Sequence, residues 1–323
     1  MNSGLILTGK DVRLFMGYFL LPGQIKPYGL LPWAGVSEGR SKPGAPITAV
    51  MSGSDRVTLF ATDPNGGIYT ASGSPQGGWG PWAGVSEGRS KPGAPITAVM
   101  SGPDRVTLFV TDPNGGIYTA SGSPQDGWGP WAGVSEGRST PGAPIAAVMS
   151  GSDRVTLFVT DPNGGIYTAS GSPQGGWGPW AGVSEGRCKP GAPIAAVMSN
   201  SDRVTLFVTD PNGGIYTASG SPQNGWGPWA GVSEGRSTPG APIAAVMSGP
   251  DRVTLFVADT NGGIYTASGS LQDGWGPWAG VSEGRSTPGA PIAAVMSGSD
   301  RVTLFVTDPN GGIYTISIKL RKL

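Results

Sequence analysis

Short apolar runs separated by polar turn sequences recur along this chain. In one unit the runs occupy residues 47–51, 57–62 and 68–72, and each is rich in β-branched or aromatic residues. Between the second and third runs lies Asp-Pro-Asn-Gly-Gly at 63–67, a sequence typical of the turn in a β-hairpin. The pattern predicts three short antiparallel strands.

The same unit contains a fourth run that is predicted to form a strand. Residues 79–85 run from Trp79 to Val85, and a connection rich in Pro and Gly follows at 86–95. Four short antiparallel strands are the usual content of one propeller blade. The connection would then lead from the outer strand of one blade to the inner strand of the next.

The whole unit repeats every 49 residues, because the phrase P-W-A-G-V-S-E-G-R opens at six tryptophans: Trp33, Trp82, Trp131, Trp180, Trp229 and Trp278. A repeat of ~40–50 residues is the size of a propeller blade, and such units bury their apolar faces by packing on their neighbours. The sequence therefore predicts an all-β, six-bladed β-propeller of four-stranded antiparallel blades. Any ligand site should be repeated with the blades.

The two ends of the chain are complementary. The last copy stops after its third strand, at 313–316, whereas residues 32–36 supply a fourth strand with no complete blade before it. Pairing them would close the ring with strands from both termini and remove exposed edges. We expect residues 30–323 to form one propeller domain and residues 1–29 a degenerate N-terminal segment. Because residues 11–15 resemble 55–60, seven blades with a degenerate N-terminal blade are the alternative.

Composition limits the partners. The 57 glycines and 31 prolines fall at fixed places between the apolar runs, as turn residues do. The 21 basic residues equal the 21 acidic ones, so no net field attracts nucleic acid or an anionic membrane. No apolar stretch is long enough to insert in a membrane, and the first residues lack a signal-peptide pattern. We expect a cytoplasmic protein, with release independent of a classical signal as the alternative; the oligomeric state stays open.

Catalytic and metal-binding residues are scarce. The chain has no histidine and a single cysteine, Cys188, in a position that the other copies fill with serine. This excludes Ser-His-Asp, Cys-His and zinc chemistry in their ordinary forms. We expect no cofactor, no metal and no enzymatic activity. A glycosidase that uses Asp and Glu is the best enzymatic alternative, but its asymmetric centre does not fit near-identical blades.

The S-E-G-R loop offers the recurring charged pair that is hardest to explain structurally, because a Pro/Gly-rich loop needs no such pair to form. Ligand binding is one interpretation, and a solvated or inter-blade salt bridge is the other. The pairs are Glu38 and Arg40, Glu87 and Arg89, Glu136 and Arg138, Glu185 and Arg187, Glu234 and Arg236, and Glu283 and Arg285. By contrast, we expect Asp63 to accept hydrogen bonds from the backbone of its own turn.

The tryptophans of the fourth strand are the second group of candidates. Trp79 and Trp82 lie three apart, so strand alternation predicts that they face opposite ways. Glycines flank Trp79, which favours it as an exposed platform and Trp82 as the core residue. An exposed indole beside a guanidinium and a carboxylate is a usual sugar-binding arrangement. The platform residues would be Trp79, Trp128, Trp177, Trp226 and Trp275, whereas the first copy has Leu30 there, so one of six sites should be defective.

The pattern W-x-x-W-x-x-V…R-V-x-L-F…D-x-N-G-x-I-Y resembles the β-propeller lectins of mushrooms and bacteria over residues 30–318. The tectonin-like and Photorhabdus-type lectins, and above all the six-bladed N-acetylglucosamine-binding lectins of the Agrocybe kind, are similar. The resemblance implies a multivalent, agglutinating lectin with a role in fungal defence, which binds glycans and glycoproteins in clefts between blades or on one face.

One departure bears on the sugar. Fucose-binding lectins of the Aleuria type carry Glu at the end of the third strand, where this chain has Ile68-Tyr69-Thr70. The difference disfavours fucose and favours N-acetylglucosamine or a methylated sugar. A protein-interaction scaffold without a sugar ligand is the alternative function.

Overall fold

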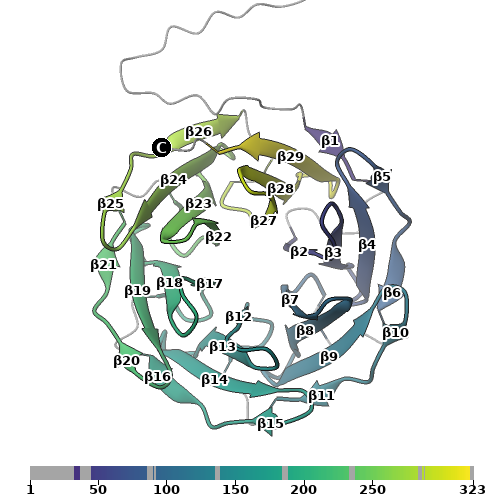
Figure 1. Cartoon of the computed structure of the whole chain (residues 1–323), viewed down its shortest axis with the longest axis horizontal. Coiled ribbons are helices and arrows are strands. Elements are labelled where there is room, and N and C mark those ends of the chain that lie inside the picture. The colour runs from purple at the N-terminus through teal and green to yellow at the C-terminus, as the bar shows by residue number, and fades with distance from the viewer. Residues whose placement is uncertain are drawn as a thin grey trace, which may run out of the picture.

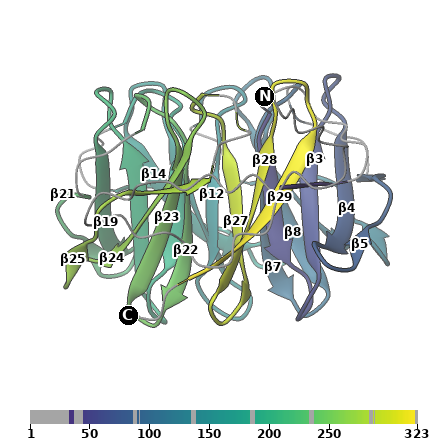
Figure 2. The same cartoon turned by 90° about the horizontal axis from the view of Figure 1, so that it is seen from above.

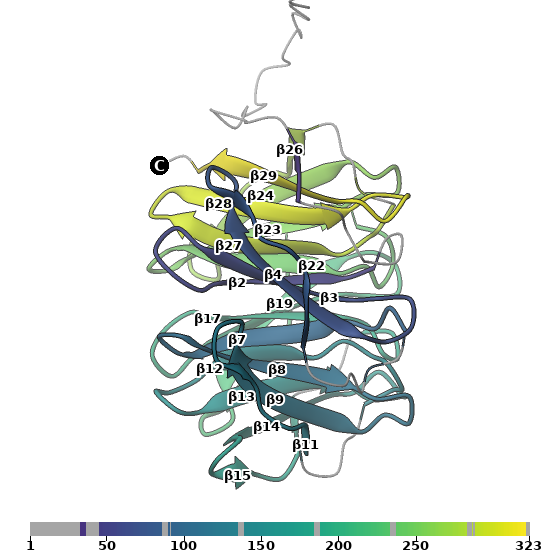
Figure 3. The same cartoon turned by 90° about the vertical axis from the view of Figure 1, so that its right-hand side faces the viewer.

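The computed structural model describes residues 33–36, 45–85, 90, 92–134, 139–183, 188–232, 237–282, 286 and 288–320. Six antiparallel sheets stand side by side around a central axis and form a six-bladed β-propeller (Figure 1). Figures 2 and 3 show the blades from the side, with turns and loops at both ends of the ring. The predicted fold class is confirmed. Within the described residues, no helix is long and apolar enough to cross a membrane.

Each blade contains three long strands and a short outer fourth strand. Blades 1 to 3 consist of β2 (Ile47–Met51), β3 (Val57–Thr62), β4 (Ile68–Ser74), β5 (Gly78–Trp79) and β6 (Ala83–Val85); β7 (Ile96–Gly102), β8 (Arg105–Thr111), β9 (Ile117–Ser123), β10 (Gly127–Trp128) and β11 (Ala132–Gly133); and β12 (Ala146–Met149), β13 (Val155–Thr160), β14 (Ile166–Ser172), β15 (Gly176–Trp177) and β16 (Ala181–Val183).

Blades 4 to 6 repeat this arrangement, and the last takes its outer strand from the N-terminal side of the chain. They consist of β17 (Ile194–Met198), β18 (Val204–Thr209), β19 (Ile215–Ser221), β20 (Gly225–Trp226) and β21 (Ala230–Gly231); β22 (Ile243–Gly249), β23 (Arg252–Ala258), β24 (Ile264–Ser270), β25 (Gly274–Trp275) and β26 (Ala279–Ser282); and β27 (Ile292–Gly298), β28 (Arg301–Thr307), β29 (Ile313–Lys319) and β1 (Ala34–Gly35).

The second strand of each blade is buried on both faces. In β3 every residue is buried, and alternation sends Val57 and Leu59 toward blade 6 and Phe60 toward blade 2. The apolar clusters accordingly span two neighbouring blades, one at each blade boundary. The core of the protein is therefore a ring of contacts between blades.

The fourth strand differs from the prediction of one run over 79–85. It consists of two short pieces, β5 and β6, which both pair with β4. Gly80 donates a backbone hydrogen bond to the Ser72 carbonyl at 2.9 Å, and the chain then leaves the ladder until Ala83. The break at Gly80–Trp82 removes the strict alternation on which the assignment of Trp79 and Trp82 to opposite faces rested.

The approach of β5 to β4 requires a glycine. A Cβ atom at Gly73 would lie 2.3 Å from the Gly78 carbonyl oxygen and 2.7 Å from the Trp79 Cα. The equivalent glycines in blades 2 to 5 show the same crowding, whereas blade 6 has Ile318 at this position. Blade 6 therefore cannot accept a fourth strand along the path that β5 takes.

The ring closes through strands from the two sides of the chain, as predicted. Ala34 and Gly35 of β1 pair with Thr315 and Tyr314 of β29, and Val36 donates a backbone hydrogen bond to the Ile313 carbonyl at 2.9 Å. The inner strand β27 contacts β2, so six blades complete the circle. The seven-bladed alternative is wrong because no gap is left between blades 6 and 1. Residues 1–29 lie outside the described residues.

The close approach of the outer strand to the third strand predicts that two glycines of blade 3 differ in how much an alanine in their place destabilises the protein. A Cβ at Gly171 would lie 2.3 Å from the Gly176 carbonyl oxygen, whereas a Cβ at Gly182 meets nothing within 4 Å. We expect Gly171→Ala to lower the free energy of unfolding by about 1–3 kcal/mol, as overpacking does. The control Gly182→Ala should change it by less than about 0.5 kcal/mol. Equal urea midpoints for the two variants would contradict the crowded crossing.

Candidate ligand site in the clefts between blades

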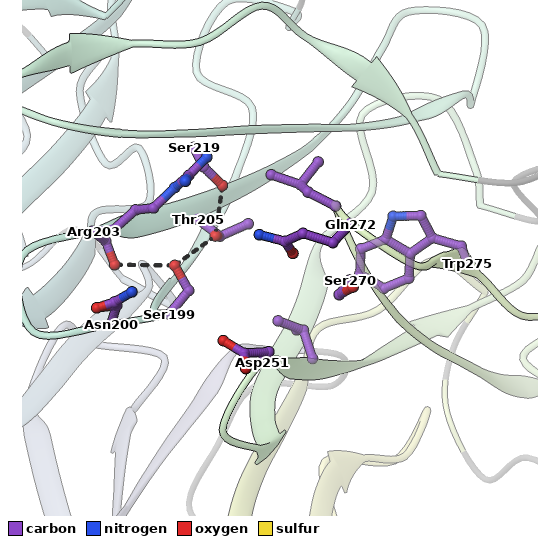
Figure 4. Close-up of a pocket in the computed structure, with 11 residues that line it drawn as sticks. Ser199, Asn200, Arg203, Thr205, Ser219, Asp251, Ser270, Gln272 and Trp275 are labelled. Carbon is purple, nitrogen blue, oxygen red and sulfur yellow. Dashed lines mark hydrogen bonds between the residues drawn. The ribbon is translucent and has the colours of Figure 1, made fainter. Parts of the chain in front are cut away.

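A polar cleft opens where two neighbouring blades meet, at the end of the blade that carries the S-G-S-D turn. Cleft 4/5, between blades 4 and 5, shows its composition (Figure 4). Blade 4 contributes Ser199, Asn200, Arg203, Thr205 and Ser219, and blade 5 contributes Asp251, Val253, Ser270, Leu271, Gln272 and Trp275.

The same residue types meet in other clefts. Cleft 2/3 brings Arg105 of blade 2 to Asp153 and Gln174 of blade 3. In cleft 6/1, Arg301 of blade 6 meets Asp55 and Gln76 of blade 1. Each of these clefts thus combines one guanidinium, one carboxylate and one primary amide. The opposite charges cancel, which suits a neutral polar ligand.

A row of hydroxyl groups forms the floor on one side of each cleft. In blade 4 the Thr205 hydroxyl lies 2.9 Å from the Ser199 hydroxyl and 2.7 Å from that of Ser219 (Figure 4). Period-two alternation places the arginine and this threonine on the same face of the second strand. The other five blades repeat the triplet at 2.7 to 2.9 Å.

The arginine and the glutamine reach each other across the boundary. With its amide oriented so that the oxygen faces the guanidinium, Gln125 Oε1 of blade 2 accepts hydrogen bonds from Arg56 Nη1 at 3.0 Å and Nη2 at 2.9 Å. Both side chains are exposed. A hydroxyl-bearing ligand could replace the glutamine as the partner of the arginine without leaving a buried charge unpaired.

The predicted platform tryptophans pack against the preceding blade. Five indoles stand edge-on to a buried phenylalanine of the neighbour, with ring centroids 5.5 to 5.6 Å apart and interplanar angles of 85° to 89°. The pairs are Trp79 with Phe305, Trp128 with Phe60, Trp177 with Phe109, Trp226 with Phe158, and Trp275 with Phe207. Trp275 also lines cleft 4/5, so this residue both packs and faces the cleft.

Trp79 and Trp82 do not divide into an exposed and a core residue. Both are half-buried, and both pack against the same apolar cluster between blades 6 and 1. The physical reason is the break in the fourth strand, which lets the two rings turn to one side. The Trp82 Nε1 atom is buried and makes no hydrogen bond within the described part of the chain.

The turn aspartates behave as predicted and lie at the other end of the blade. Asp63 Oδ1 accepts backbone hydrogen bonds from Asn65 at 2.8 Å and from Gly67 at 2.7 Å. These bonds hold the Asp-Pro-Asn-Gly-Gly turn and leave no sign of a ligand. Among the described residues, no cluster of His, Cys, Asp or Glu could hold a metal ion.

The Glu and Arg residues of the S-E-G-R loops, from Glu38 and Arg40 to Glu283 and Arg285, lie outside the described residues. Their described neighbours show where the loops begin and end. Val85 pairs with Ile68, and Ser90 donates a hydrogen bond to the Gly66 carbonyl at 3.1 Å, so both loop ends lie beside the Asp63 turn. Trp79 pairs with Gly73, five residues further along β4, a distance of roughly 17 Å at the usual rise per residue. Trp79 therefore lies at the opposite end of β4 from the described ends of its loop, and its counterpart Trp275 lines the polar cleft between blades 4 and 5.

Cleft 5/6 is different from the others. Here Phe256 borders an apolar cavity of about 210 Å³. The wall of this cavity also includes Ile318 of β29 and Leu320, the residue that follows β29. Ile318 belongs to the apolar cluster that contains Phe256. Lys319, which occupies the position of Ser74 in blade 1, forms an ion pair with Asp300 at 3.4 Å. Leu30 itself lies outside the described residues. The first copy, to which Leu30 belongs, supplies the outer strand of blade 6, and cleft 5/6 is the cleft where blade 6 meets blade 5.

The second-strand arginine and the glutamine of the clefts are not among the residues that the sequence predicted for the site. The glutamine recurs at 76, 125, 174, 223 and 272, next to a position that varies among Gly, Asp and Asn. The glutamine is the same in all five copies although the residue after it varies, and this difference could have marked it as a candidate site residue.

Comparisons with known proteins find the fold in several lectins. BP39L lectin from Burkholderia pseudomallei has a TM-score of 0.69 at 21% identity, over 88% of this chain and 83% of that chain. Aleuria aurantia lectin, solved with Fucα1-6GlcNAc, has a TM-score of 0.66 at 17% identity, over 86% and 93%. AofleA from Arthrobotrys oligospora has a TM-score of 0.69 at 14% identity, over 90% of both chains. No protein-family model and no curated protein matches the sequence. At these identities the likeness shows the fold alone.

The edge-on ring pairs predict a measurable coupling. In a double-mutant cycle with Phe60→Leu and Trp128→Leu, we expect an interaction term of about 0.5–1.5 kcal/mol in the free energy of unfolding. The matched control pairs Phe60→Leu with Trp177→Leu, whose ring contacts Phe109 instead, and should show additivity within about 0.5 kcal/mol. Additivity in both cycles would show that Trp128 does not stabilise the blade boundary.

Proposed function

We propose that this protein is a multivalent lectin that binds a neutral sugar in the clefts between its blades and has no enzymatic activity. The observation that carries the proposal is the recurring cleft of one arginine, one aspartate, one exposed glutamine and a row of hydroxyl groups, to which Trp275 adds an indole in cleft 4/5. These groups offer planar hydrogen-bond donors and acceptors beside an aromatic surface, as sugar hydroxyls and C–H faces require.

The partners that we propose are glycans and glycoproteins. Several equivalent sites of modest affinity would gain an avidity of roughly 10²–10⁴ on a surface that carries many sugars. The structural neighbours, which their descriptions call lectins, support this class. Agglutination, a role in fungal defence and a cytoplasmic location remain part of the proposal.

For the sugar we propose N-acetylglucosamine or a methylated sugar. Two neighbours were solved with fucose-containing ligands, Fucα1-6GlcNAc and α-methyl fucoside. In this chain the third strand has Thr70 where the fucose-binding pattern has Glu, and the Thr70 hydroxyl is buried and makes no hydrogen bond to any described residue. Thr70 therefore offers a ligand neither a carboxylate nor an accessible hydroxyl. A glycan array that includes both sugars tests the choice, and a silent array would favour the protein-interaction scaffold.

Two sets of charged residues compete for the site, and they can be separated by mutation. Variant A changes the cleft arginines Arg56, Arg105, Arg154, Arg203 and Arg301 to Gln; variant B changes Glu38, Glu87, Glu136, Glu185, Glu234 and Glu283 to Gln. We expect variant A to lose roughly 10- to 100-fold in affinity per site, as a lost charged hydrogen bond implies. Because the arginines are exposed, each change should alter the free energy of unfolding by less than about 0.5 kcal/mol.

Variant B is the counter-test, measured by isothermal titration and urea unfolding alongside variant A. Retained binding in variant B places recognition in the clefts. Loss of binding in variant B with retention in variant A would instead place it in the S-E-G-R loops. Unfolding of variant B would identify those pairs as structural bridges.

The altered sixth boundary predicts the stoichiometry. Clefts 1/2, 2/3, 3/4, 4/5 and 6/1 have the ring pair, whereas cleft 5/6 has Ile318 and Leu320 beside Phe256. We expect five sugars per chain in titration, and a ligand-soaked crystal should show cleft 5/6 empty of sugar. Equal occupancy in all six clefts would mean that the indole only packs and would move the stacking role to Trp82 or Tyr69.

A further inference from the structure

Two departures from the repeat meet in one cleft. The position after the first serine of the S-G-S-D turn is glycine in five blades, at 53, 102, 151, 249 and 298, and asparagine only in blade 4, at Asn200. The position before the cleft glutamine is proline in blades 1 to 4, at 75, 124, 173 and 222, and leucine only in blade 5, at Leu271. These residues come from different blades, yet both line cleft 4/5.

Neither residue belongs to the apolar core. Leu271 is 38% exposed, the only large hydrophobic side chain among the described residues that is exposed, and it belongs to none of the apolar clusters. A leucine in place of proline also gives up the restricted backbone of the turn. Asn200 is exposed, and its amide makes no hydrogen bond within the described part of the chain. Packing of the apolar core therefore does not account for either residue.

Together the two residues extend the surface that a ligand would meet. Figure 4 shows Asn200 beside Ser199 on the blade 4 side, opposite Asp251 and Gln272 of blade 5. Leu271 adds an apolar wall on the blade 5 side, next to Gln272 in the chain. Compared with the clefts at the other boundaries, cleft 4/5 has one more amide, from Asn200, and has the aliphatic side chain of Leu271 in place of a turn proline.

We propose that cleft 4/5 is a distinct, higher-affinity subsite for a neutral sugar with a methyl-bearing substituent, an acetamido or O-methyl group. The methyl group packs on Leu271, and the Asn200 amide hydrogen-bonds to a neighbouring hydroxyl of the same glycan. This inference rests on the proposed lectin function and adds that the five clefts are not equivalent. The chain would then engage a glycan first at this boundary and gain avidity from the other four.

The expected size of the effect follows from the area involved. Burial of one methyl-sized group against Leu271 corresponds to about a fourfold gain in affinity, the factor equivalent to about 0.8 kcal/mol. The hydrogen bond from an exposed Asn200 adds at most a similar factor. We therefore expect a midpoint at cleft 4/5 about 4- to 15-fold lower than at the other clefts.

The test reads each cleft separately through its own indole. The full chain is labelled with fluorotryptophan, and the ¹⁹F signals of Trp79, Trp128, Trp177, Trp226 and Trp275 are assigned by single Trp→Phe variants. The labelled protein is titrated with N-acetylglucosamine and, in parallel, with α-methyl fucoside; glucose, which lacks the methyl group, is the control sugar. We expect the Trp275 signal to reach its midpoint first with a methyl-bearing sugar, and at the same concentration as the other four with glucose.

The other blades contain the residues needed for matched variants. These substitutions are therefore compatible with the fold. Leu271→Pro and Asn200→Gly install the residues of the other blades and should bring the Trp275 midpoint to the common value. The reciprocal Pro124→Leu should lower the midpoint of Trp128 in cleft 1/2 by about fourfold. Five equal midpoints in the unmutated chain, or a Trp275 midpoint unmoved by Leu271→Pro, would overturn the subsite while leaving the lectin function intact. No response of any signal to either methyl-bearing sugar, together with a silent glycan array, would overturn the lectin function itself.

Discussion

The apolar contact across each blade boundary is the interaction on which the ring depends, and at five of the six boundaries it includes an edge-on contact between a phenylalanine of one blade and an indole of the next. A single blade of this length cannot bury both faces of its sheet, so its apolar residues need the neighbouring blade. Phe60, for example, is fully buried only because blade 2 covers it, and Trp128 completes that cover at the outer side. At the boundary between blades 4 and 5, the indole that covers the phenylalanine, Trp275, also borders the polar cleft. Arg203 lines the same cleft but is absent from the apolar clusters.

The cleft itself is a product of strand alternation at the blade boundary. Phe60, Thr58 and Arg56 lie on the same face of the chain, and Arg56 directly precedes β3 at the end of the blade. The apolar contact at Phe60 is therefore followed by the hydroxyl group of Thr58 and then by a guanidinium group. The neighbouring blade supplies the aspartate and the glutamine from two turns at the same end. One arginine and one aspartate line each of clefts 2/3, 4/5 and 6/1, so the charges of the lining residues balance there.

The sequence predicted the ring well because repetition carries the information. The 49-residue period, the strand pattern and the complementary ends led to six blades and to the pairing of β1 with β29, and Asp63 takes the predicted turn bonds. The site was harder to predict for two physical reasons. The break at Gly80 is invisible to an alternation argument, so Trp79 and Trp82 were assigned to opposite faces although both pack on one cluster. The second reason is that strand pairing places Trp79 and the described ends of its loop at opposite ends of β4, which their order in the sequence does not show. The Glu and Arg residues of the loops lie outside the described residues, so their role stays a prediction.

Closure of the ring also explains why one boundary must differ. In blades 1 to 5 the outer strand follows its own β4-type strand and passes over a glycine so closely that no Cβ fits. In blade 6 the outer strand comes from the other side of the chain, and the third strand continues through Ile318 to Lys319. Once Ile318 packs on the cluster around Phe256, the path that brings a tryptophan to this boundary is closed. A ring closed in this way gains a continuous sixth interface, and Ile318 and Leu320 lie beside Phe256 there in place of the aromatic pair of the other five boundaries.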